Sequence, residues 1–193
     1  SEDGNLKRLV NEHLELVLLD TNSYYDELKL IAERDRLEKI FRSNGYYDFN
    51  KKYIDYELDT VSQKLKLTVN IRKTTKDEYH KIYRLNAIKV KVDQSDLLET
   101  EDSAITRDYK NVHFAYGQRM YRPKILYGKT EIAAGQKYNF TYSQNTQRNL
   151  SQLEVFKYVN LTYQKDSRTQ TLVANIEAAS NTKFQISDEI GFS

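Results

Sequence analysis

The sequence contains no cysteine and no tryptophan, and it has a single proline among 193 residues. The absence of cysteine excludes disulfides and thiolate metal sites, and it is compatible with an oxidising or a reducing compartment. No apolar run approaches the ~20 residues that a membrane-spanning helix needs. The chain opens on SEDGN rather than on a signal peptide, so any targeting segment would precede residue 1.

A large excess of one charge is also missing, because 30 Lys and Arg balance 28 Asp and Glu, for a net charge of +2. Lys89 and Lys91, with Tyr83 nearby, could contact single-stranded nucleic acid, but acidic residues interleave with the basic ones and argue against it. Tyrosine is abundant instead, with 16 tyrosines against 7 phenylalanines. Tyrosine suits half-buried strands and interfaces, so the composition favours sheets with one wet face.

Residue patterns for catalysis or metal binding are not found either. The three histidines are dispersed and lack metal-ligand spacing. No Ser-His-Asp set and no glycine-rich phosphate loop can be assembled. Asp55, Glu57 and Asp59 alternate along a predicted strand, roughly 7 Å from one to the next; they could bind a cation, but a solvated strand face is favoured. We therefore predict no catalytic residues, no metal, no cofactor and no small-molecule substrate: the protein is not an enzyme. The histidines are His13, His80 and His113.

Helical periodicity predicts a short helix over 5–13 and a long one over 24–43. On the long helix, Leu37 and Phe41 face inward and Glu33 faces water. The apolar run 14–20 is expected to be extended and packed on the core. Gly45 ends the long helix, because a residue without Cβ enters the left-handed conformation without strain.

Strict alternation then predicts an antiparallel hairpin, with strands over 53–59 and 64–73 that each have one solvated face. The polar stretch 74–78 is the best boundary in the chain. A linker over 74–81, without Pro or Gly, is expected to be semi-rigid.

The second half repeats this order. A strand over 82–93 comes first, and 95–109 is expected to be an acidic surface loop. Helices are predicted over 124–130 and 144–155, and two strands follow, joined through 165–169. The fold class is therefore α+β, with two tandem domains of β-α-α-β-β order, each a three-stranded sheet with two helices on one face. The first domain (1–78) shows no opening strand, and the second (79–180) carries an insertion at about 94–119.

Two stretches resemble a known family. LEKIFRSNGYYDFNKKYIDYELD (37–59) resembles the helix-to-strand segment of a POTRA domain, where Gly45 is followed by Tyr46 and Tyr47. Residues 122–163 resemble the membrane-proximal POTRA of outer-membrane assembly and translocation factors. The matching positions are Gly135, Tyr138, Thr146, Leu150, Leu153, Phe156, Lys157 and Val159. The chain thus resembles the BamA/TamA superfamily, most closely its TamA-like lipoprotein form (TamL), in which VLLDT before the long helix also has a counterpart. The missing opening strand and the insertion depart from the family pattern.

The resemblance implies a function in protein assembly and transport at the periplasmic face of the bacterial outer membrane. An unpaired strand at the border of a sheet can accept an extended polypeptide through main-chain hydrogen bonds. In POTRA domains the second strand is such an edge, which implicates two segments as peptide-binding strands. The partners would be unfolded outer-membrane precursors or an accessory protein, with no nucleic acid. The candidate site residues are Tyr53, Ile54, Asp55, Tyr56, Glu57, Leu58, Lys157, Tyr158, Val159, Asn160, Leu161, Thr162 and Tyr163.

The end of the chain leaves two interpretations open. Residues 181–193 alternate, and the resemblance implies that they begin the first strand of a C-terminal transmembrane β-barrel. The alternative is an ordinary extended tail. In the same way, the whole chain could instead be a periplasmic or surface scaffold that binds a fixed partner and assembles no barrel.

Overall fold

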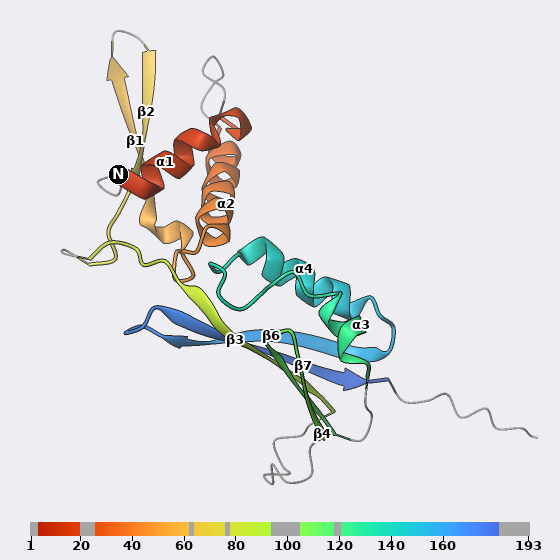
Figure 1. Ribbon diagram of the computed structural model, residues 1–193. Coiled ribbons are helices and arrows are strands. Elements are labelled where there is room, and N and C mark those ends of the chain that lie inside the picture. Colours follow the sequence, from red (N-terminus) through yellow and green to blue (C-terminus); the bar gives the residue numbers. More distant parts are fainter. Residues whose placement is uncertain are drawn as a thin grey trace, which may run out of the picture.

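The computed structural model describes residues 4–19, 26–61, 64–75, 78–93, 105–117 and 121–181. It contains a two-stranded sheet followed by a five-stranded sheet, each backed by helices (Figure 1). The α+β class and the presence of two sheets confirm the prediction from the sequence. The helices are α1 (Gly4–Glu12), α2 (Glu27–Ser43), α3 (Pro123–Tyr127) and α4 (Phe140–Ser151), with short 3-10 turns η1 (Leu14–Leu16) and η2 (Lys51–Tyr53). The strands are β1 (Ile54–Val61), β2 (Lys64–Ile71), β3 (Arg84–Val92), β4 (Ile105–Tyr109), β5 (Val112–Tyr116), β6 (Phe156–Asp166) and β7 (Thr171–Ser180).

The first core forms where α1 and α2 pack on the start of β1. The Asp26 side chain accepts the N–H groups of Leu28 and Lys29, which satisfies donors that the first turn of α2 leaves free. The helix ends at Gly45, whose φ of +103° is strained for other residues, and the Tyr46 N–H returns to the Phe41 carbonyl. This stop turns the chain towards the core, whose buried residues are Leu6, Leu9, Leu37, Phe41, Tyr46, Phe49 and Ile54.

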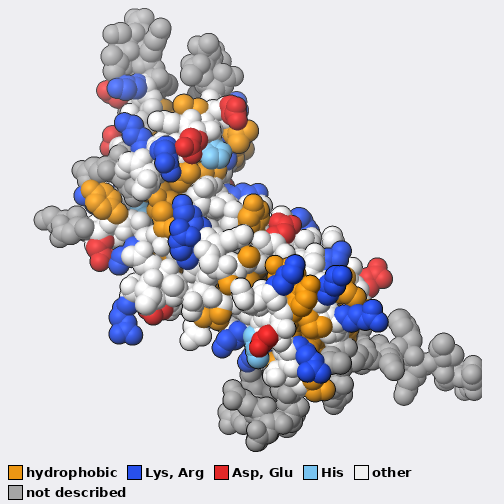
Figure 2. All heavy atoms as spheres, in the orientation of Figure 1, with side chains coloured by type: hydrophobic (Ala, Val, Ile, Leu, Met, Phe, Trp, Pro, Cys, Tyr) orange, Lys and Arg blue, Asp and Glu red, His pale blue; other side chains and the backbone are white. Residues whose placement is uncertain are grey.

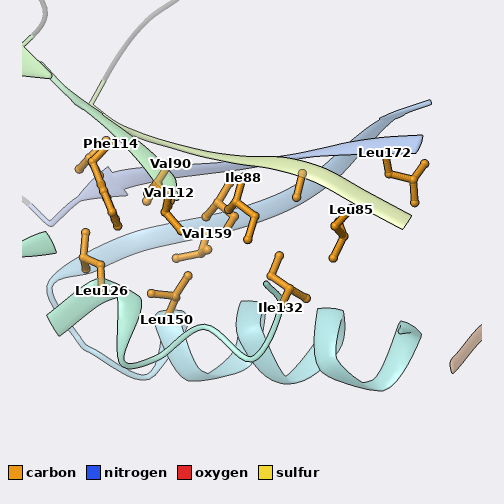
Figure 3. Packing of buried hydrophobic residues seen from close by; sticks show 14 of the residues in the cluster. Leu85, Ile88, Val90, Val112, Phe114, Leu126, Ile132, Leu150, Val159 and Leu172 are labelled. Atoms are coloured by element: carbon orange, nitrogen blue, oxygen red, sulfur yellow. The ribbon is translucent and has the colours of Figure 1, made fainter. Parts of the chain in front are cut away.

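The second core lies between one face of the five-stranded sheet and the helices α3 and α4. The strand order is β4-β5-β3-β7-β6, and the central β3 runs parallel to both of its neighbours. In Figure 3, Leu126, Ile132 and Leu150 point from the helix side towards Ile88, Val90 and Phe114 of the sheet. Apolar residues alternate along β3 and β7, which buries one face of each strand.

The insertion predicted at about 94–119 is described in part, since residues 94–104 and 118–120 lie outside the described residues. The surface loop expected over 95–109 is wrong for residues 105–109, which form β4 of the hairpin β4-β5, and β5 pairs with the outer edge of β3. The sheet therefore has five strands, where the sequence predicts three. Lys110 and Asn111 both have positive φ, the two-residue turn geometry that matches the twist of paired strands. The alternation of Val112, Phe114 and Tyr116, all buried, is the signal for β5 in the sequence.

Three further expectations for the N-terminal part are wrong. Leu14, Leu16 and Leu18 are about half exposed and do not lie in the core, because η1 turns the chain away from it. Glu33 was expected to face water, but it is only 3% exposed. Tyr53 was expected in a strand, but it belongs to η2, and the strand begins at Ile54.

Two helices of the second half are confirmed with shifted ends. α4 begins at Phe140 rather than Gln144, because the Asn139 side chain accepts the Tyr142 N–H and caps the helix there. α3 begins at Pro123, whose ring fits the first turn of a helix. Leu150 remains in the core after the shift, while Leu153 lies beyond the end of α4 and is half-buried.

Candidate functional site

The border of the five-stranded sheet at β6 contains one of the two segments predicted to bind peptides. β6 has β7 on one side and no strand among the described residues on the other (Figure 1). Ala178 of β7 uses its carbonyl to accept the N–H of Asp93, at 2.9 Å, so its polar groups point away from β6. Since polar groups alternate along a strand, Val159, which lies opposite Ala178, faces the free border.

The same alternation indicates which way the backbone groups of the other β6 residues point. The backbone groups of Val159, Leu161, Tyr163 and Lys165 face the free border, and those of the residues between them pair with β7. The side chains of Val159, Leu161 and Tyr163 are buried or half-buried beneath α4, whereas Tyr158 and Thr162 are exposed on the other face. An incoming strand would therefore pair with residues whose side chains are already held by the core. Lys157 and Asn160, also predicted site residues, are exposed.

The other predicted segment, β1, belongs to a sheet with two strands among the described residues. Ile54 is 1% exposed and part of the first core, so its side chain is not available to a partner. Asp55 forms an ion pair with Arg72 at 2.7 Å, and the Tyr56 hydroxyl donates to the Leu30 carbonyl. Glu57 is exposed, and of Leu58 only the backbone pairing with Leu67 is described.

A cluster of four tyrosines, here called the junction tyrosines, joins the two halves of the chain. Tyr47 comes from the segment after α2, and its ring lies 5.0 Å from that of Tyr138 and 5.7 Å from that of Tyr163, both edge-on contacts. Tyr83, just before β3, lies 6.0 Å from Tyr47. Sequence reasoning identified Tyr47 and Tyr138 as motif residues, but nothing in the sequence indicates that they meet.

Polar contacts extend this junction. The Ser43 and Thr141 hydroxyls lie 3.0 Å apart, and the Lys165 ammonium contacts both oxygens of Asp48, at 2.9 and 3.0 Å. In addition, the Gly45 carbonyl accepts the Tyr83 N–H at 2.8 Å. The helix end and turn that close the first half therefore lie directly against the second sheet.

Burial changes the acid–base behaviour of two of these tyrosines, Tyr163 and Tyr138. It raises the pKa of Tyr163, an effect that the hydrogen bond between the Tyr163 and Ser143 hydroxyls partly offsets. Burial likewise raises the pKa of Tyr138, and the nearby Arg42 guanidinium acts in the opposite direction. Both phenols stay neutral far above physiological pH, so they act as packing and hydrogen-bonding groups.

The described part of the chain offers no candidate metal centre. Those residues contain no group of three or more His, Cys, Asp or Glu side chains that could hold a metal ion. The residues that the structure describes also include no helix with the length and hydrophobicity needed to span a bilayer. On the face shown in Figure 2, Lys and Arg side chains spread along the molecule rather than gather in one patch.

Comparison with solved structures identifies the fold. The structure of BamA from Haemophilus ducreyi lacking POTRA domains 1–3 matches 90% of this chain with a TM-score of 0.56 and 10% identity. This chain spans 27% of the length of that one. The protein thus has a fold similar to that of part of this BamA structure, and at this identity the likeness concerns the fold alone.

Two other matches are weaker. The N-terminal domain of Omp85 from Thermosynechococcus elongatus has a TM-score of 0.32 at 11% identity, with 90% of this chain and 92% of that chain covered. POTRA3-5 of Haemophilus influenzae BamA has a TM-score of 0.31 at 10% identity, with 92% and 91% covered. No protein-family model and no curated protein matches the sequence.

Proposed function

We propose that this chain is the polypeptide-binding part of a factor that assembles or translocates outer-membrane β-barrel proteins, and that the β6 border docks its clients. The carrying observation is that the outer border of β6 faces no further strand among the described residues, and that a packed core holds this border in place. Main-chain pairing is indifferent to side chains, which suits a factor that handles many different unfolded precursors.

The fold also supports the cellular location that this proposal implies. The matched structure is a BamA protein that lacks POTRA domains 1–3, and this chain resembles part of it in fold. By analogy, we place the chain at the periplasmic face of the bacterial outer membrane, with domains over 1–78 and 79–180 and a transmembrane barrel after them. Residues 182–193, which would begin that barrel, lie outside the described part of the chain. The lipoprotein (TamL) form remains a prediction from the sequence, as does an accessory protein as the alternative occupant of the border.

A second candidate is a scaffold that binds one fixed partner and assembles no barrel. The border strand β4 favours it, because β4 is mostly exposed and its charged residues Arg107 and Asp108 discourage indiscriminate pairing with other strands. A downstream reading frame with alternating strands of roughly ten residues would support the assembly factor. A further globular domain in that position would support the scaffold.

The test is a titration of the 193-residue chain with a synthetic peptide, acetyl-TVTVTVTV-amide, followed by backbone amide NMR. We expect shifts and slowed amide exchange at Leu161 and Tyr163. An analogue N-methylated at every residue keeps the side chains but has no backbone N–H to donate, and it should bind at least tenfold more weakly. Shifts scattered away from β6 and β1, or equal binding of both peptides, would contradict the proposal.

A further inference from the structure

We propose that the side chain of Gln147 closes one end of the β6 border, and that an incoming strand therefore pairs first at Leu161 and Tyr163. This inference rests on the proposed function, since it concerns how the same border is used. It goes further by naming the register of the peptide and the group that competes with it.

The first observation concerns α4, which packs against β6. The Gln147 side-chain amide donates to the carbonyl of Val159, at 3.1 Å. That carbonyl is one of the groups that face the free border, as the pairing of Ala178 with β3 requires. An N–H from an added strand would need the same acceptor. Gln147 thus takes the place of a peptide group within the folded chain.

The second observation concerns the opposite end of β6. Lys165 also faces the border, and its ammonium is held by the Asp48 carboxylate from the other half of the chain. The Tyr47 ring lies against Tyr163 on the face that α4 covers. The segment between α2 and β1 therefore lies beside the C-terminal end of the border and limits how far an added strand can continue.

Between these two ends, Leu161 and Tyr163 are the border residues whose carbonyls accept from no side chain in the described chain. Each can exchange both of its backbone hydrogen bonds with an antiparallel partner. Pairing with only two border residues gives weak binding, and weak binding suits a client that must later be released. When the Gln147 side chain moves off the Val159 carbonyl, Val159 can form one more pair of backbone hydrogen bonds with the added strand. The Gln147 side-chain amide therefore sets how many residues of that strand can pair.

The experiment compares Gln147→Ala with Gln144→Ala in the full chain. Gln144 is an exposed residue of the same helix, and its side chain forms no hydrogen bond with the described residues of β6. With the peptide acetyl-TVTVTVTV-amide, Gln147→Ala should lower the Kd about three- to tenfold, because one further pair of backbone hydrogen bonds forms. Gln144→Ala should leave the Kd unchanged.

Amide exchange gives a second readout that does not depend on affinity. In the parent chain, the peptide should slow exchange at Leu161 and Tyr163 but not at Val159; in Gln147→Ala, it should slow exchange at all three. Protection of Val159 in the parent chain, or a Kd unchanged by Gln147→Ala, would overturn this inference while the docking function stands. If neither chain shows protection at Leu161 and Tyr163, the docking function itself fails, and this inference fails with it.

Discussion

At the scale of single residues, Glu33 shows how a charged side chain can hold a fold together from inside. Its carboxylate accepts two hydrogen bonds from Arg36, at 2.5 and 2.7 Å, and one from the Leu18 N–H at 3.1 Å. Arg36 in turn donates to the His13 carbonyl. The pair therefore fastens the segment after α1 to α2, where the exposed leucines of that segment contribute little burial.

We expect Glu33→Ala to lower the free energy of unfolding by about 1–3 kcal/mol, because Arg36 and the Leu18 N–H lose a buried acceptor. Urea unfolding followed by circular dichroism measures the change. Glu38→Ala is the matched control, since Glu38 lies on the same helix and forms no ion pair with a described residue; it should change stability by less than about 0.5 kcal/mol. Equal effects of the two substitutions would show that the buried pair contributes nothing specific.

At the scale of elements, two turns contain a glycine with positive φ, and they require glycine for different reasons. Gly45 has a φ of +103°, and a Cβ there would lie 2.7 Å from the Ile82 methyl Cγ2, in the segment that leads to β3. Gly135 has a φ of +84°, but a Cβ there would meet nothing within 4 Å. The first turn therefore requires glycine for its conformation and for the close approach of the two halves, whereas the second requires it for conformation alone.

Gly135→Ala should cost about 1–2 kcal/mol, the strain of a left-handed residue with a Cβ. Gly45→Ala should cost more, by about a further 1–3 kcal/mol, because the added methyl overpacks against Ile82. Thermal or urea unfolding of both variants provides the comparison. If Gly45→Ala is no worse than Gly135→Ala, the contact with Ile82 is not a tight one.

At the scale of the whole molecule, three of the junction tyrosines, Tyr83, Tyr138 and Tyr163, contribute to how the stability of the fold depends on pH. Burial raises the pKa of Tyr83, Tyr138 and Tyr163 above the ordinary value near 10. Their surroundings include Arg42 beside Tyr138, and Asp48 with Lys165 beside Tyr83. A proton that the folded chain retains and the unfolded chain loses makes stability fall as pH rises.

Stability should accordingly be level up to about pH 9 and fall above pH 10, where unfolded tyrosines ionise and the buried ones do not. Each such tyrosine contributes a slope of up to about 1.4 kcal/mol per pH unit. Urea unfolding between pH 8 and 11, with tyrosinate absorbance recorded in parallel, measures it. Tyr163→Phe should reduce the slope, whereas the exposed Tyr158→Phe should not; identical slopes in both variants would contradict the assignment.

The sequence by itself determined the local structure of this protein. Period-two alternation specified the hairpin β1-β2 and the pair β6-β7, and Gly45 specified the end of α2, because these signals act between neighbouring residues. The β4-β5 hairpin carried a readable signal in Val112, Phe114 and Tyr116, but its place beside β3 depends on a parallel pairing between segments distant in the sequence.

Only the tertiary structure decided which contacts form between these elements. The burial of Glu33 follows from how the segment after α1 crosses α2, and the contact of Gln147 with Val159 follows from how α4 packs on the border strand. Likewise, Tyr47 meets Tyr163 because the two halves of the chain touch. Such contacts join residues far apart along the chain, and no periodicity encodes them. Local patterns therefore determined which segments become strands, while long-range pairing and packing decided which strand lies at the border and which part of it is left open.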